Sequence, residues 1–160
     1  MQIESTRFGR IEIRDDAVLT FPEGLIGLPG TSYALLSQSP DAVFYWLQSL
    51  EDPSLALPVT TPWLFFPGYR VELSDEDAGR LGMAEPEQAG VMCIVRAAES
   101  LDDFRINLRG PIVIERVGLV ARQVINAAGD HGVSEPLFVH VPLEAVTPVS
   151  PPAPVAATGV

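Results

Sequence analysis

The chain has 160 residues, 47% of them apolar and 19% charged, and its 21 acidic and 10 basic residues give a formal net charge of −11. This length predicts one domain with a substantial core, and the longest apolar runs are far too short to cross a membrane. Such a negative surface repels phosphate, so it disfavours direct nucleic-acid binding and suits a basic protein partner. Taken alone, the charge equally suits a surface that only keeps the protein dissolved.

Localisation follows from the cysteine content and from the start of the chain. A single cysteine, Cys93, excludes an internal disulfide framework and fits a reducing compartment. The first residues lack the charged and then apolar pattern of a signal peptide. We therefore expect a cytoplasmic protein in which Cys93 is a small buried hydrophobe.

The first sixty residues predict short strands separated by turn residues. Apolar and polar residues alternate around Ile11 and Ile13, and proline and glycine interrupt the pattern after residue 21. Residues 33–36 predict another short strand, and 55–57 predict a returning one. Residues 58–62 hold two prolines, which favour an edge strand or an irregular bend.

The stretch 44–57 is the most informative part of this region. Phe44 and Trp46 would point to one face of a strand, and Tyr45 and Leu47 to the other. Because both faces are apolar, we expect a central strand. Pro53 then breaks the pattern, so the strand delivers Glu51 and Asp52 to an exposed turn.

The second half predicts one short helix among further strands. Ser74 precedes three acidic residues and can cap a helix that ends near Leu81, with Gly82 as its stop. Strands are expected at 90–97, 104–108, 112–114, 122–125 and 137–141. This pattern predicts a mostly β fold, a small antiparallel β-barrel-like domain with one short helix, over residues 1–146. Residues 147–160, rich in proline and alanine and without charge, predict a disordered tail.

The chain offers little material for catalysis. No nucleophile motif is complete, and the only histidines are His131 and His140. One cysteine and two histidines cannot build a structural zinc site, and no glycine-rich segment is followed by the residues of a phosphate cradle. We expect no cofactor, no metal and no enzymatic activity. The alternative is a small hydrolase that uses carboxylates and His131, next to Asp130.

Five segments in register resemble the FliW family of flagellar assembly factors. They are TRFGRIEI, FPEGLIGLPG, FYWLQSLEDPSLAL, LFFPGYRVELSDED and NLRGPIVIE, between Thr6 and Glu115. The resemblance implies a cytoplasmic, non-enzymatic barrel with two alternating protein partners. One is CsrA, an RNA-binding regulator that represses flagellin mRNA and is relieved by binding. The other is flagellin itself.

Exposure arguments on the family-like segments give candidate partner-binding residues. The set consists of an acidic pair, an aromatic group and a polar pair: Glu51, Asp52, Phe66, Pro67, Tyr69, Asn107 and Arg109. The carboxylates would meet basic groups of a partner, and the rings of Phe66 and Tyr69 would supply apolar anchors. The sequence departs from the family at Gly68, where an aspartate is common, and in the segment after residue 125.

Overall fold

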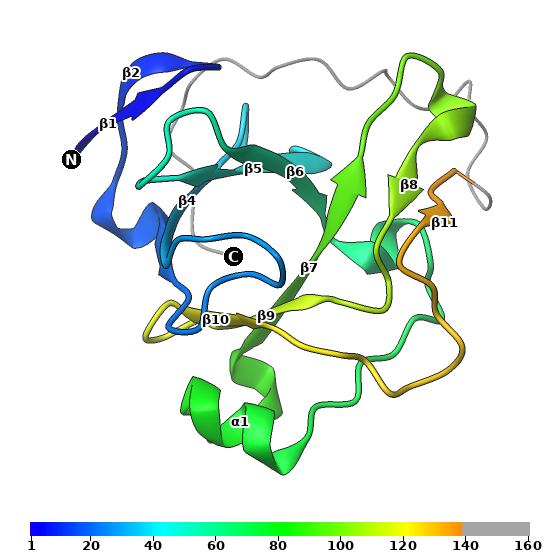
Figure 1. Ribbon diagram of the computed structural model, residues 1–160. Helices are drawn as coiled ribbons and strands as arrows, with labels where there is room; N and C mark the ends of the chain where they lie inside the picture. Colours follow the sequence, from blue (N-terminus) through cyan, green and yellow to red (C-terminus); the bar gives the residue numbers. More distant parts are fainter. Residues whose placement is uncertain (139–160) are drawn as a thin grey trace.

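The computed structural model describes residues 1–138. Within them, seven strands close into a barrel in the order β7, β6, β5, β4, β3, β10, β9 and back to β7 (Figure 1). Their bounds are β3 (Val18–Thr20), β4 (Ser32–Leu36), β5 (Phe44–Ser49), β6 (Ala56–Thr60), β7 (Ala89–Arg96), β9 (Ile112–Glu115) and β10 (Val120–Gln123). The predicted antiparallel barrel is confirmed, and the contact between β3 and β10 is its one parallel pairing in this part of the chain.

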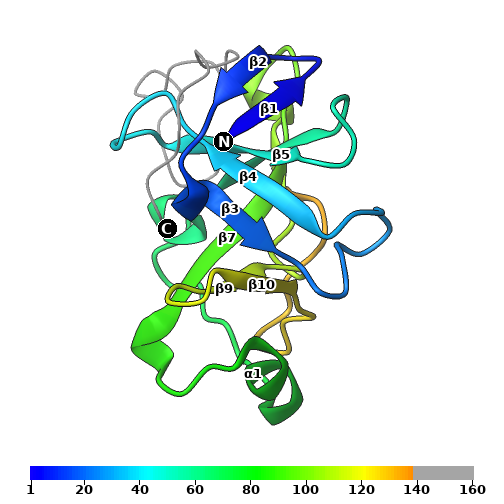
Figure 2. The same cartoon turned by 90° about the vertical axis from the view of Figure 1, so that its left-hand side faces the viewer.

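Shorter elements are attached around the barrel. The hairpin of β1 (Gln2–Ser5) and β2 (Gly9–Glu12) lies at one end, and helix α1 (Asp75–Leu81) lies at the other (Figure 2). Strand β8 (Arg105–Ile106) pairs with the end of β7, and β11 (Glu135–Pro136) pairs with β8. Short 3-10 turns cover Asp15–Ala17, Pro62–Leu64, Pro86–Gln88 and Leu101–Asp103.

The barrel strands bury side chains on both faces. Leu47 of β5 packs inside the barrel, whereas Trp46 packs under the β1–β2 hairpin with Ile3 and Ile11. On β7, Met92 points into the barrel, and Cys93 and Val95 belong to a second cluster outside it. The second cluster includes Phe65, Tyr69, Phe104, Ile106, Leu108 and Leu137. Because alternate residues of one strand serve two cores, β5 is the central strand that its sequence predicts.

The helix is formed by local signals. The hydroxyl of Ser74 accepts a hydrogen bond from the Asp77 amide at 3.1 Å, which satisfies one free donor of the first turn. Gly82 ends the helix with φ +67°, in the left-handed region that glycine adopts without strain. The predicted start and stop of this helix are both confirmed.

Several strand boundaries differ from the prediction, including that of β10, which covers Val120–Gln123 in place of the expected 122–125. Residues 58–60 lie inside β6, and Pro58 is tolerated because the pairing of β6 with β7 begins only at Val59. The expected strand 104–108 shrinks to Arg105–Ile106, since the amides of Leu108 and Arg109 both donate to Gly132 instead. The last described strand is Glu135–Pro136, earlier than the expected 137–141. The rest of that prediction, including His140, and the predicted tail lie outside the described residues.

Candidate functional site

The sequence points to two surfaces, and the first is the acidic corner, which we define as residues 49–55 between β5 and β6. The side-chain amide of Gln48 holds this turn together, and Gln48 itself is fully buried. Its Nε2 donates to the carbonyls of Ser49, Pro53 and Leu55 at 3.0–3.3 Å, and its Oε1 accepts from the hydroxyl of Ser5 at 2.8 Å. Every polar atom of this side chain is therefore satisfied within the protein.

The two carboxylates of the acidic corner are used by the fold. Glu51 Oε1 accepts from the backbone amides of Thr31 at 2.6 Å and Ser32 at 2.7 Å. Asp52 Oδ1 accepts from the amide and the hydroxyl of Ser54, at 2.9 and 2.6 Å. The amide bonds from Thr31 and Ser32 lower the pKa of Glu51, and the bonds from Ser54 lower the pKa of Asp52, because each stabilises the ionised form.

The acidic corner is thus a preorganised turn. The Ser49 hydroxyl accepts from the amides of Glu51 and Asp52, and the Thr6 amide donates to the Pro53 carbonyl, which ties the corner to the β1–β2 hairpin. Both carboxylates remain exposed to solvent, as the sequence predicts. Their hydrogen-bonding capacity toward a partner is reduced, but their charge is not.

The second surface is the aromatic corner, which we define as residues 62–69. The turn Pro62–Leu64 leaves Trp63 39% and Leu64 55% exposed, whereas Phe65 is buried at 3%. The indole nitrogen of Trp63 donates to the Tyr69 carbonyl at 2.6 Å, and the two rings lie 6.0 Å apart. This bond fixes an exposed indole in one orientation.

The expected exposure of Tyr69 is wrong. Its side chain is 3% exposed, because the ring packs into the second cluster and the hydroxyl donates to the Leu108 carbonyl at 2.6 Å. Burial raises the pKa of Tyr69, and burial likewise raises the pKa of the neighbouring Cys93 to about 12. Cys93 is fully buried, as expected. The neutral forms of both groups therefore persist at physiological pH.

A second buried amide, Asn126, organises the aromatic corner. Its Nδ2 donates to the Tyr69 hydroxyl at 3.2 Å and to the Arg70 carbonyl at 2.8 Å. Its Oδ1 accepts from the amides of Glu72 at 3.0 Å and Ala128 at 3.1 Å. Asn126, which is only 5% exposed, thus joins the aromatic corner to the segment that follows β10.

A hollow opens beside this corner. Its volume is about 480 Å³, and Phe66, Pro67, Gly68, Tyr69 and His131 line it. The His131 ring lies 4.8 Å from the Tyr69 ring. Among residues 1–138, no carboxylate, serine or cysteine lines the hollow beside His131.

The predicted polar pair lies on the same side of the molecule. The side chain of Asn107 accepts from the Gly110 amide at 2.9 Å and so shapes the bend that follows. The backbone of Arg109 donates to Gly132 and accepts from Asn126, while its side chain is exposed. Asn107 therefore has a structural bond, and the backbone of Arg109 is bonded to Asn126, the residue that organises the aromatic corner.

The two corners lie at opposite ends of β5. Phe44 begins this strand and its ring lies 5.9 Å from that of Phe65 in the aromatic corner, whereas Glu51 follows the other end. At about 3.3 Å per residue, the six residues of the strand separate the corners by roughly 17 Å. In Figure 1 the turn after β5 lies on the side of the β1–β2 hairpin, and the segment after β6 leads toward β8. The predicted residues therefore form two surfaces.

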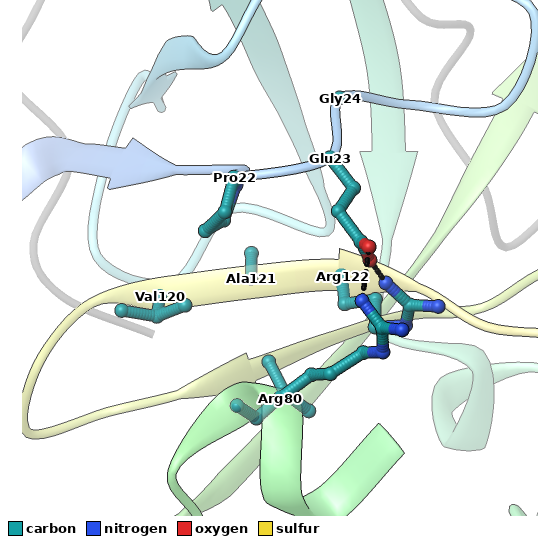
Figure 3. Close-up of a pocket in the computed structure, with 8 residues that line it drawn as sticks. Pro22, Glu23, Gly24, Arg80, Val120, Ala121 and Arg122 are labelled. Atoms are coloured by element: carbon teal, nitrogen blue, oxygen red, sulfur yellow. Dashed lines mark hydrogen bonds and ion pairs between the residues drawn. The ribbon is translucent and has the colours of Figure 1, made fainter. Parts of the chain in front are cut away.

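A third feature, which the sequence did not indicate, is an ion-paired cleft beside α1. Its volume is about 150 Å³, and the Glu23 carboxylate points between the guanidinium groups of Arg80 and Arg122, pairing with both (Figure 3). Arg122 also donates to Asp77 at 2.7 Å. These pairs hold the helix against β10, and their cations are occupied by neighbouring carboxylates.

Sequence reasoning missed the two residues that organise the corners. Gln48 stands inside an apolar strand, where a polar side chain must find partners or pay a desolvation cost. Asn126 follows two apolar residues in the same way. A polar amide in an apolar run was the available signal for both.

Residues 1–138 contain neither a candidate metal-ligand cluster nor a candidate membrane-spanning helix. No group of three or more potential ligands among His, Cys, Asp and Glu is placed to hold a metal ion there. Within the same residues, no helix has the length and apolar character needed to span a membrane.

Comparisons with known proteins agree with the resemblance. The family model described as FliW protein matches residues 2–137. A flagellar assembly factor FliW from Bdellovibrio bacteriovorus is 34% identical over 139 residues, which cover 86% of this chain and 79% of that protein. The same factor from Natranaerobius thermophilus is 33% identical over 140 residues, covering 86% and 93%.

The fold has a solved counterpart. A crystal structure of the flagellar assembly factor FliW superimposes with a TM-score of 0.76 at 28% sequence identity, over 86% of this chain and 97% of that one. The residues 2–137 that the family model matches include the strands of the barrel and both corners, and the chain therefore belongs to the FliW family of flagellar assembly factors.

Proposed function

We propose that this protein binds a CsrA-like RNA-binding regulator, which relieves the repression of flagellin mRNA, and binds flagellin as the alternating partner. The observation that carries the proposal is the family match over residues 2–137. A regulator of translation and newly made flagellin both occur in the cytoplasm, so we place the protein there. Neither partner requires this chain to bind nucleic acid.

The electrostatics support a basic partner. With a net charge of −11, the protein attracts a cationic surface at long range and speeds the encounter. Glu51 and Asp52 contribute to this field, although their oxygens are held by backbone amides and by Ser54. We propose that the acidic corner steers a partner by its charge.

The aromatic corner supplies the contact surface in this proposal. Interface energy concentrates in aromatic anchors that are rigid before binding. Trp63 is such an anchor, because its hydrogen bond to Tyr69 fixes an exposed ring. Phe66, Pro67 and Tyr69 line the adjacent hollow. Asn107 and Arg109 flank Leu108, whose carbonyl accepts from the Tyr69 hydroxyl, and we propose that this polar pair extends the contact surface.

Calorimetry of the purified full chain with each partner tests the proposal. We expect heat with the regulator and with flagellin at low salt, and loss of regulator binding when flagellin is added in excess. Higher salt should weaken regulator binding, since the attraction is screened beyond about 10 Å at 0.1 M. Absence of heat with both cognate partners at low salt contradicts the proposal.

Surface variants distinguish the two roles. Trp63→Ala should weaken binding about 30-fold, the effect of losing about 2 kcal/mol at an interface anchor. Leu64→Ser, at a neighbouring side chain 55% exposed, checks that the loss does not come only from the hydrogen bond of Trp63. Asp52→Asn should slow association and reduce its salt dependence while leaving dissociation unchanged.

A further inference from the structure

Two arginines face each other where β7 extends beyond the barrel. Strand β7 pairs with β8 in a register that sets Arg96 directly opposite Arg105 (Figure 1). The preceding pair in the register, Val95 and Ile106, is buried in the second cluster, so the two arginine side chains lie on the other face of these strands. Arg96 is exposed and Arg105 is half-buried. The Cβ atoms of such a pair are about 5 Å apart, and like charges placed in this way destabilise a sheet.

Neither arginine is compensated by a carboxylate. The ion-paired cations of residues 1–138 are the N-terminal amine and the side chains of Arg10, Arg14, Arg80 and Arg122. On the next strand, β11, Pro136 lies opposite Arg105 and brings no charge to the row. The protein has 21 acidic residues for 10 basic ones, so carboxylates are not scarce. An unpaired pair of adjacent cations is therefore unexpected in this chain.

Acidic residues border the arginine pair without forming ion pairs with it. The connection between β7 and β8 carries three exposed acidic side chains, those of Glu99, Asp102 and Asp103. None of them is ion-paired within the described part of the chain. On β11, the carboxylate of Glu135 lies against Gly132. The surface thus combines two adjacent cations with an acidic loop.

We propose that Arg96 and Arg105 together bind a carboxylate of a partner protein whose neighbouring side chains are basic. A carboxylate between two guanidinium groups accepts charge-assisted hydrogen bonds from both and offsets their repulsion. The basic side chains beside it then meet Glu99, Asp102 and Asp103. A nucleic acid does not fit this pattern, because the acidic loop and the net charge of −11 repel its continuous row of phosphates. This inference does not depend on the partners proposed above.

Titration of the full chain with a short blocked peptide tests the site. The peptide carries two adjacent glutamates flanked by lysines, and NMR follows the Nε–Hε signals of the arginine side chains. The signals of Arg96 and Arg105 should shift. The signal of Arg116, an exposed arginine between β9 and β10 that has no ion pair among residues 1–138, should not. Added salt should reduce the shifts, since it screens exposed charges.

Matched variants and peptides identify the contacts. Arg96→Gln and Arg105→Gln should each weaken the peptide about fivefold, near the upper limit for one exposed ion pair. Arg116→Gln, the matched control, should leave the affinity unchanged. A peptide with glutamines in place of the glutamates should not shift either arginine, and one with glycines in place of the lysines should bind more weakly than the parent.

A double-mutant cycle tests the arginine pair without any ligand. Each of Arg96→Gln and Arg105→Gln relieves the same repulsion, so the double variant should gain less stability in urea than the two single changes predict together. The same cycle on Arg96 and Arg116 should be additive. Additivity at Arg96 and Arg105 would mean that the two charges do not interact, and it would overturn the site.

The remaining outcomes separate the possible ligands. Shifts that are equal with the glutamine peptide, or that survive both arginine substitutions, overturn carboxylate recognition, as does the absence of any shift. Tighter binding of inorganic phosphate or of a single-stranded oligonucleotide than of the peptide overturns the mixed-charge partner and assigns the pair to phosphate. The test uses only this chain and the named probes, so failure of the regulator or of flagellin to bind does not affect its result.

Discussion

The acidic corner and the aromatic corner are built alike and present different surfaces. Each is held by one buried side-chain amide, Gln48 in the first and Asn126 in the second. Gln48 bonds to nearby backbone carbonyls and to the distant hydroxyl of Ser5, whereas Asn126 bonds to backbone groups more than fifty residues away. In the acidic corner the exposed carboxylates already accept hydrogen bonds within the protein, Glu51 from the Thr31 amide and Asp52 from the Ser54 amide. In the aromatic corner the polar groups are buried and satisfied, and a hollow remains beside them.

This difference shows that the type of a residue does not decide whether its side chain is free to contact a partner. Glu51 is exposed and yet engaged by two backbone amides, whereas Tyr69 is aromatic and yet buried beneath the surface it supports. The acidic corner offers charge at a distance, which acts on association rates. The aromatic corner offers area for contact, which acts on residence time.

The largest expected effect is the loss of either organising amide. Gln48→Ala and Asn126→Ala should each lower the free energy of unfolding by about 3 kcal/mol, because several buried partners lose their hydrogen bonds at once. Urea unfolding of both variants measures this. Similar losses confirm that the corners share one construction.

The half-buried side chain of Asn107, which makes one hydrogen bond, provides the control for that experiment. Asn107→Ala removes a single hydrogen bond, to the Gly110 amide, and should cost about 1 kcal/mol. An Asn126→Ala loss no larger than that of Asn107→Ala contradicts the central role of Asn126.

The next effect concerns two glycines, one packed against the acidic corner and one within the aromatic corner. Gly30 has φ +102°, and a Cβ added there would lie 3.5 Å from the Glu51 carboxylate, so Gly30→Ala should cost about 2 kcal/mol through backbone strain. Gly68→Ala should change stability by less than about 0.5 kcal/mol, since its Cβ meets open space. Thermal unfolding of both variants tests this difference, and equal losses would contradict it.

Removal of the Tyr69 hydroxyl should lower the free energy of unfolding by a smaller amount. Tyr69→Phe loses the bond to Leu108 and leaves Asn126 with one partner fewer, which should cost about 1 kcal/mol. Tyr45→Phe is the matched control, because its exposed hydroxyl makes only a 3.5 Å contact with the Pro40 carbonyl. Chemical unfolding should show no measurable loss for Tyr45→Phe.

The smallest effect is the pH dependence that Glu51 contributes. Its pKa is lower in the folded protein than its ordinary value of 4.5, so the ionised group stabilises the fold above that value. This stabilisation is lost as pH falls from about 4.5 through the lower folded pKa. Urea midpoints of wild type and Glu51→Gln should therefore differ at pH 7 and converge in acid. A difference that persists once the carboxyl is protonated would assign the effect to side-chain shape.

The sequence by itself determined the elements that depend on near neighbours. Ser74 and Gly82 bound a helix whose capping bonds span only a few residues. The alternation in residues 44–47 identified a strand buried on both faces, and turns with proline and glycine separated the strands of the barrel. Steric and hydrogen-bonding preferences within a few residues are readable directly from their order.

The tertiary structure alone decided what each candidate residue does. Glu51 bonds to amides about twenty residues earlier in the chain, and Asn126 bonds to Tyr69 from 57 residues away. Arg109 and the aromatic corner came to one side of the barrel, and the acidic corner came to the other end of β5. These relations depend on how the barrel closes, and a residue sequence specifies closure only through the sum of many weak, distant contacts.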